Sequence, residues 1–119
     1  MKSHLLGTRG EAFATGYLRA HGYEIIGTNI HSPNGEIDCL CKLKAILVCV
    51  EVKTRSRGTM GSPYDAVNTL KRYKIMQTAY FYLQTHHITY SSIQIDVISL
   101  VINPNGTVHE LKHFKNVRV

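Results

Sequence analysis

The chain has 119 residues, 44% of them hydrophobic, and its 14 Lys and Arg against 8 Asp and Glu give a formal charge of +6. This length predicts one globular domain, residues 1–119, and leaves too little chain for two. No apolar run is long enough for a signal peptide or a bilayer span, so we expect a cytoplasmic protein without a membrane partner. The excess of basic residues favours a polyanionic partner such as nucleic acid.

The first predicted element is a helix near the amino terminus. Thr8 and Glu11 have the spacing of a capping box, which predicts a helix that begins at Thr8. Gly22 is placed to end it in a left-handed conformation. On this pattern alone, Glu11 is a capping residue.

Three strands are expected next, at residues 23–29, 36–41 and 46–53, with turn chemistry at 31–35. Alternation along the last two places Asp38 on the same sheet face as Glu51 and Lys53. With a hairpin loop at Leu43 and Lys44, Asp38 pairs near Cys49, and Glu36 pairs near Glu51. Glu36 is a ligand, a base or an exposed residue, and exposure is the expected state.

Two carboxylates and an ammonium on one sheet face suit the chemistry of phosphodiester hydrolysis. Hard cations such as Mg²⁺ or Mn²⁺ take oxygen ligands and keep several waters, so Asp38 and Glu51 suffice to hold one. Lys53 can then orient the attacking water and offset charge on the phosphate. The alternative is that Glu51 and Lys53 are solvated residues of an edge strand, although they end the most apolar run in the chain.

A second helix is expected from Ser62 to about His86, because Ser62, Pro63 and Asp65 form a start signal. The apolar residues that mark it at helical spacing include Leu70, Tyr73 and Tyr80. A different stripe carries Lys71, Lys74 and Thr78 and faces either nucleic-acid phosphates or water. There is no tryptophan, and the seven tyrosines are scattered, so the sequence shows no platform for stacking single-stranded bases. The residues expected to grip phosphates are Arg55, Arg57, Lys71 and Lys74.

The chain ends with two predicted strands, at 92–101 and 107–114, joined by a turn at 103–106. Asp96 interrupts the first of these strands and is either a buried, hydrogen-bonded structural acid or a support for the site. The order helix, three strands, helix, two strands predicts an α/β sandwich with a mixed central sheet flanked by helices.

An acid on one strand followed by Glu-x-Lys on the next resembles the PD-(D/E)xK motif of restriction-endonuclease-like nucleases. GEID at 35–38, VEVKTR at 50–55 and IDVI at 95–98 are similar to the YraN family of small bacterial proteins. This chain departs from those patterns in having Ile37 where the motif has proline, and Ile30 and His31 after Asn29 where the family reads Asn-x-Arg.

The resemblance, which extends to Holliday-junction resolvases, implies a restriction-endonuclease-like fold and a Mg²⁺- or Mn²⁺-dependent endonuclease. It assigns the metal to Asp38 and Glu51, the water to Lys53, and a further carboxylate ligand to Glu11. It also implies DNA rather than RNA as the substrate, and a homodimer as one arrangement. The rival interpretations are a nucleic-acid-binding module with a relict site, and an accessory protein that acts through a protein partner.

Overall fold

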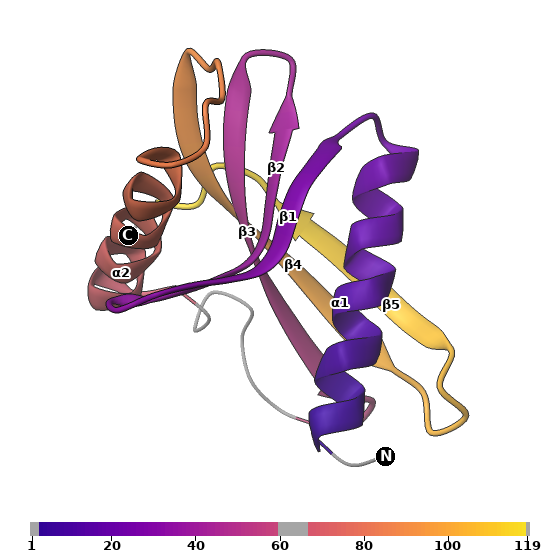
Figure 1. The fold of residues 1–119 in the computed structure, drawn as a ribbon. Helices are drawn as coiled ribbons and strands as arrows, with labels where there is room; N and C mark the ends of the chain where they lie inside the picture. Colours follow the sequence, from indigo (N-terminus) through magenta and orange to yellow (C-terminus); the bar gives the residue numbers. More distant parts are fainter. Residues whose placement is uncertain (1–2, 60–66, 119) are drawn as a thin grey trace.

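The computed structural model describes residues 3–59 and 67–118. The predicted order of helices and strands is confirmed, and it forms an α/β sandwich around one mixed sheet (Figure 1). The two helices and five strands are α1 (Ser3–Ala20), β1 (Glu24–Ser32), β2 (Gly35–Leu43), β3 (Ile46–Ser56), α2 (Thr69–Leu83), β4 (Ser92–Ile102) and β5 (Val108–Phe114). In the part of the chain described, no helix is long and apolar enough to cross a membrane.

The strands lie in sequence order across the sheet, and only the β3–β4 pair is parallel. The crossover between these two strands contains α2, so α1 and α2 lie on opposite faces of the sheet (Figure 1). Each face has its own apolar core. Cys49 belongs to the core under α2, whereas Val50 belongs to the core under α1, as strand alternation requires.

Helix α1 begins earlier than the sequence predicts. It starts at Ser3, so Thr8 lies inside the helix and the predicted capping box is wrong. An early start costs little here, because the chain from Ser3 to Thr8 contains no proline to break it. The predicted end is confirmed, since Gly22 follows the helix with φ of 87°.

Helix α2 begins at Thr69, and its N-cap is Asn68, whose side chain accepts a hydrogen bond from the Lys71 backbone N–H. The predicted start signal at residues 62, 63 and 65 lies outside the described residues. The helix ends at Leu83, three residues before the predicted end.

The buried face of α2 also differs from the prediction. It carries Ile75, Thr78 and Ala79, whereas Leu70 and Tyr73 are exposed. Small and medium-sized side chains cover the sheet here, and Tyr82 of the same helix packs against this core as well.

The β2–β3 hairpin turns one residue later than predicted. Leu43 pairs with Ile46, and Lys44 takes a left-handed conformation with φ of 55° in the two-residue loop. Leu40 therefore lies opposite Cys49, so the predicted pairing of Asp38 with Cys49 is wrong by two residues. A shift of two residues preserves the sheet face, because side chains alternate with a period of two.

The β1–β2 hairpin leaves the plane of the sheet at its midpoint. The β2–β3 ladder stops at Cys39 and Val50, and Asn29 of β1, between two regular pairs, has φ of 50°. Beyond this bend the hairpin runs under α2 (Figure 1). The Ser32 hydroxyl lies 2.8 Å from the Thr78 hydroxyl of α2. The bend exposes the end of β3 that β2 would otherwise cover.

Asp96 is fully buried on the α1 side of the sheet, as the structural interpretation predicts. Its carboxylate lies 2.7 Å from His113 Nε2 and accepts hydrogen bonds from the Gln94 side chain and the Asn116 backbone N–H. His113 in turn lies 2.9 Å from the Tyr17 hydroxyl. This network joins α1, β4 and β5 on the face opposite Glu51.

Candidate active site

Asp38 and Glu51 come together where the β1–β2 hairpin bends away from β3. Glu51 follows the core residue Cys49 by two positions, and Asp38 precedes the core residue Leu40 by two. Both acids therefore lie on the α2 side of adjacent strands, as the strand pattern predicts. Their carboxylates interact, since the charge on Asp38 raises the pKa of Glu51.

Glu51 is the more enclosed of the two acids, with 11% of its side chain exposed. Burial raises its pKa to about 7, and the charge on Asp38 acts in the same direction. Lys71 opposes both effects, because its Nζ donates a hydrogen bond to Glu51 Oε1 over 2.6 Å. With a pKa of about 7, Glu51 is partly ionised at neutral pH, and a nearby positive charge stabilises its carboxylate form.

The Asp38 side chain replaces a backbone hydrogen bond that β2 no longer makes to β3. Its Oδ2 accepts the backbone N–H of Val52 over 2.8 Å, at the point where the β2 backbone has left β3. Burial raises the pKa of Asp38, and this hydrogen bond lowers it. The carboxylate is thereby fixed in position beside the end of β3.

Glu11 approaches the two acids from α1. Burial and the charge on Asp38 raise its pKa, whereas a side-chain hydrogen bond with Asn29 lowers it. Glu11 thus lies within electrostatic reach of Asp38, and Asn29 holds it at the bend of β1. Because α1 begins well before Thr8, a capping role no longer explains Glu11.

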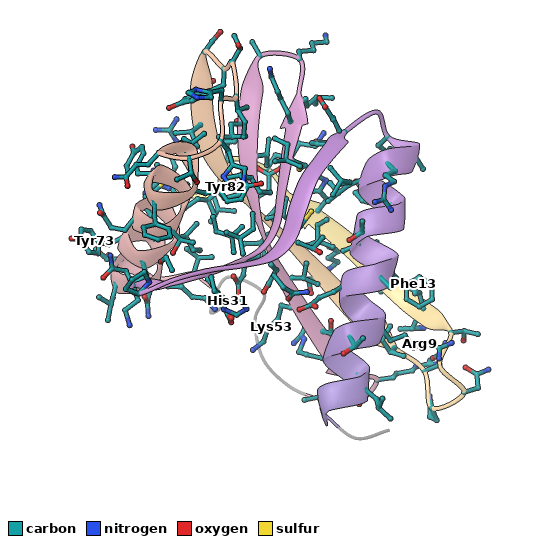
Figure 2. The ribbon with its side chains drawn as sticks, in the orientation of Figure 1. Arg9, Phe13, His31, Lys53, Tyr73 and Tyr82 are labelled. Carbon is teal, nitrogen blue, oxygen red and sulfur yellow. The ribbon has the colours of Figure 1, made fainter. Side chains whose placement is uncertain are left out.

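Lys53 follows Glu51 by two residues on β3 and has an exposed side chain. Figure 2 shows it below the β1–β2 hairpin. Among the described residues, Lys53 has no ion-pair partner, whereas Lys71 is bound to Glu51. Lys53 is therefore free to meet a ligand from solvent.

These residues fit a hard divalent cation held by two protein ligands and waters. Asp38 Oδ1 and Glu51 Oε2 have no hydrogen-bond partner among the described residues, so each carboxylate keeps one oxygen available. Within residues 3–59 and 67–118, no three His, Cys, Asp or Glu side chains are arranged to hold a metal. The donor set is thus Asp38 and Glu51, with Glu11 nearby, and Mg²⁺ commonly binds through so few carboxylates.

The four basic residues predicted to grip phosphates fall into two groups. Lys71 and Lys74 lie on the first turns of α2, where both line a hollow beside the tip of the β1–β2 hairpin. Arg55 lies on β3, and Arg57 lies just beyond its end, where the Arg57 guanidinium donates to the Asn103 side chain over 3.4 Å. Lys71 is therefore part of the acidic site itself.

Sequence reasoning missed two contacts that shape this site. In the sequence, Asn29 stood out only because Ile30 and His31 follow it, but its left-handed backbone lies at the bend of β1 and its side chain lowers the pKa of Glu11. Asparagine is one of the few residues that tolerate positive φ, so a turn at Asn29 was a detectable signal. The Lys71–Glu51 pair joins residues 20 apart in sequence and depends on how α2 docks.

Comparison with known proteins places this arrangement in a family. The model described as "Uncharacterised protein family UPF0102" matches residues 10–100, which span α1 to β4 and include Glu11, Asp38, Glu51 and Lys71. The chain belongs to the UPF0102 family. This confirms the predicted YraN resemblance.

The UPF0102 relatives align over nearly the whole chain. A UPF0102 protein of Syntrophotalea carbinolica is 38% identical over 109 residues, which cover 92% of this chain and 87% of the relative. A UPF0102 protein of Clostridium acetobutylicum is 36% identical over 110 residues, which cover 92% of this chain and 90% of the relative. One of Dictyoglomus turgidum is 29% identical over 116 residues, covering 98% of each chain. The UPF0102 name assigns no activity, so function has to be argued from the site.

Proposed function

We propose that this UPF0102 protein is a Mg²⁺- or Mn²⁺-dependent nuclease that hydrolyses phosphodiester bonds of nucleic acid, with DNA as the expected substrate. The observation that carries the proposal is the pairing of Asp38 and Glu51 on one sheet face. Burial raises the pKa of both acids, and the charge on Asp38 raises that of Glu51 further, so gathering them is unfavourable in the free protein. A bound divalent cation would offset that cost.

Each residue has a distinct role in this proposal. Asp38 and Glu51 hold the metal ion, which would activate a water molecule and polarise the scissile phosphate. Lys53 orients the water and stabilises negative charge on the phosphate, because this ammonium lies two residues from Glu51 on β3 and pairs with no carboxylate of the described residues. Glu11 supports the site through Asp38, and Lys71 and Lys74 bind the phosphates on either side.

A second function, nucleic-acid binding without hydrolysis, is favoured by the Lys71–Glu51 ion pair. This contact neutralises Glu51 without any metal ion and is short enough to be a strong charge-assisted hydrogen bond. In such a protein the acids would stabilise the bend of the hairpin, and the basic residues would bind phosphates. Lys53 supports hydrolysis instead, because it follows Glu51 by two residues on β3 and has no ion-pair partner in the described part of the chain.

Incubation with a panel of labelled nucleic acids tests the proposal. Single-stranded, duplex, flapped and four-way-junction DNA, with matching RNA, are each incubated with Mg²⁺, with Mn²⁺ and with EDTA. We expect metal-dependent cleavage of at least one substrate, and none in EDTA. Asp38→Asn, purified in parallel, keeps the shape of the side chain but removes the charge that a hard cation needs.

We expect Asp38→Asn to be inactive on every substrate, which also excludes a contaminating nuclease. If the wild-type protein cleaves nothing in the panel, or if Asp38→Asn cleaves as fast as the wild type, the nuclease proposal is wrong. Binding without cleavage would favour the second function.

A further inference from the structure

Helix α2 presents large apolar side chains to solvent. Leu70 and Tyr73 are each 61% exposed, and Tyr80 and Phe81 are 46% and 49% exposed. Figure 2 shows Tyr73 on the outer side of α2, away from the sheet, whereas Tyr82 points toward the strands. These side chains lie along one side of the helix, with Gln77 between Tyr73 and Tyr80. We call Leu70, Tyr73, Tyr80 and Phe81 the outer stripe.

The rings of the outer stripe are available for stacking. Tyr82, by contrast, is already stacked on His86, with ring centroids 3.8 Å apart and planes 4° apart. Among the residues that the structure describes, neither Tyr73 nor Tyr80 makes such a ring contact. Two exposed tyrosine rings of α2 thus carry no ring contact within the described part of the chain.

The charge along α2 is wholly positive. The helix contains Lys71, Arg72 and Lys74 and no acidic residue. Basic side chains between exposed aromatic rings are the combination that binds single-stranded nucleic acid, where rings stack on bases and ammonium groups contact phosphates. This charge pattern favours nucleic acid over an apolar protein partner, whose contact surface would gain nothing from unpaired cations.

A hollow connects the outer stripe to the acidic site. It has a volume of about 290 Å³ and lies between the hairpin tip and α2. Leu70, Lys71 and Lys74 form its α2 side, and Gly35 and Glu36 form its hairpin side. Lys71 also binds Glu51, so this hollow adjoins the acidic site. Glu36, the acid among these five residues, lies 3.4 Å from His31.

We propose that the first turns of α2 bind a single-stranded segment of the substrate, with one base stacked on Tyr73 and a neighbouring phosphate on Lys74. This rests on the proposed function and specifies its substrate, namely nucleic acid with an unpaired strand beside the cleaved bond. A paired base has its faces covered by its neighbours in the duplex, so Tyr73 can stack only on a strand that is open.

Binding measured without cleavage tests this inference. Fluorescence anisotropy is recorded in EDTA at low salt, with labelled oligo(dT) as the single strand and a blunt duplex of equal length. Tyr73→Ala should weaken binding of oligo(dT) roughly 5- to 150-fold, the range for loss of one base–aromatic stack. Tyr73→Phe keeps the ring and should bind within about twofold of the wild type.

Tyr90→Ala is the matched control, since Tyr90 is also exposed but lies outside α2. It should leave binding unchanged, and duplex affinity should be the same in all variants. The inference is overturned if Tyr73→Ala binds oligo(dT) as tightly as Tyr90→Ala, which is the result expected of a protein-docking stripe. Equal losses on duplex and single strand would also overturn it.

Because no metal is present, this assay is independent of hydrolysis. A protein that cleaves DNA but binds oligo(dT) without Tyr73 would refute the stacking site and leave the nuclease intact. A protein that needs Tyr73 for binding but cleaves nothing would refute only the nuclease.

Discussion

The pKa of Glu51 is raised by burial and by Asp38 and lowered by Lys71, so the protonation of Glu51 should affect the stability of the fold. Burial and Asp38 favour the neutral acid, whereas Lys71 favours the carboxylate, and the resulting pKa is about 7. A carboxyl group with a raised pKa binds its proton more tightly in the folded protein than in the unfolded chain. The stability it contributes is complete below its ordinary pKa of 4.5 and is lost as pH rises through about 7.

We predict that, in EDTA, the free energy of unfolding of the wild-type protein falls between pH 5 and pH 8. Glu51→Gln should remove most of this fall and be more stable than the wild type at pH 8, by at most roughly 3 kcal/mol at about 1.36 kcal/mol per pKa unit. Lys71 tolerates the loss of its partner because its side chain is 44% exposed. Urea titrations at the two pH values give the measurement.

The exposed residue Glu24 supplies the control for this titration. Glu24→Gln should keep the pH dependence of the wild type. If the free energies of unfolding of Glu51→Gln and Glu24→Gln depend on pH in the same way, the pKa of Glu51 is not raised in the folded protein as argued.

At the scale of elements, α1 brings Glu11 to the site by packing closely on β3. The contact is made by Gly10, where an added methyl group would lie 2.8 Å from Thr54 Cβ and Cγ2 and closer still to Oγ1. Glycine therefore lets the helix approach the strand more closely than any other residue would.

We predict that Gly10→Ala displaces α1 from β3, costs about 1 to 3 kcal/mol of stability and moves Glu11 away from Asp38. Gly16→Ala is the matched variant on the same helix, because nothing lies within 4 Å of its added methyl group. It should be neutral or stabilising by up to about 1 kcal/mol. Thermal unfolding of both variants gives the comparison.

Thr54→Ala in the Gly10→Ala background removes Oγ1 and Cγ2 and should recover part of the loss. Equal stability of Gly10→Ala and Gly16→Ala would show that α1 does not depend on this close contact.

For the whole molecule, local patterns predicted the order of elements and the shared face of Asp38 and Glu51. The predicted sheet face was right despite an error of two residues in strand register, because side chains alternate between faces and an even shift leaves each on the same face. Asn29 could mark a turn in the sequence, but the direction of the bend was not predictable, since it depends on the docking of the hairpin tip against Thr78.

The faces of α2 were the main failure of sequence reasoning. Large apolar residues at helical spacing usually mark the buried side, but here the sheet and the bent hairpin leave room for Thr78 and Ala79. Tyr73 and Tyr80 were therefore placed inside, and Lys71 was placed on the outer, phosphate-facing stripe. Which stripe of a short helix is buried depends on the shape of its partner, and that shape arises from long-range contacts.

The most direct test of the nuclease proposal measures Mn²⁺ affinity and single-turnover cleavage together in Lys53→Ala. Lys53 acts on water and phosphate and not on the metal, so Mn²⁺ should bind Lys53→Ala as it binds the wild type. Cleavage should fall by about 100- to 1000-fold, the usual cost of one strong transition-state contact. Unchanged cleavage by Lys53→Ala, or a loss of Mn²⁺ affinity equal to that of Asp38→Asn, would contradict the assigned roles.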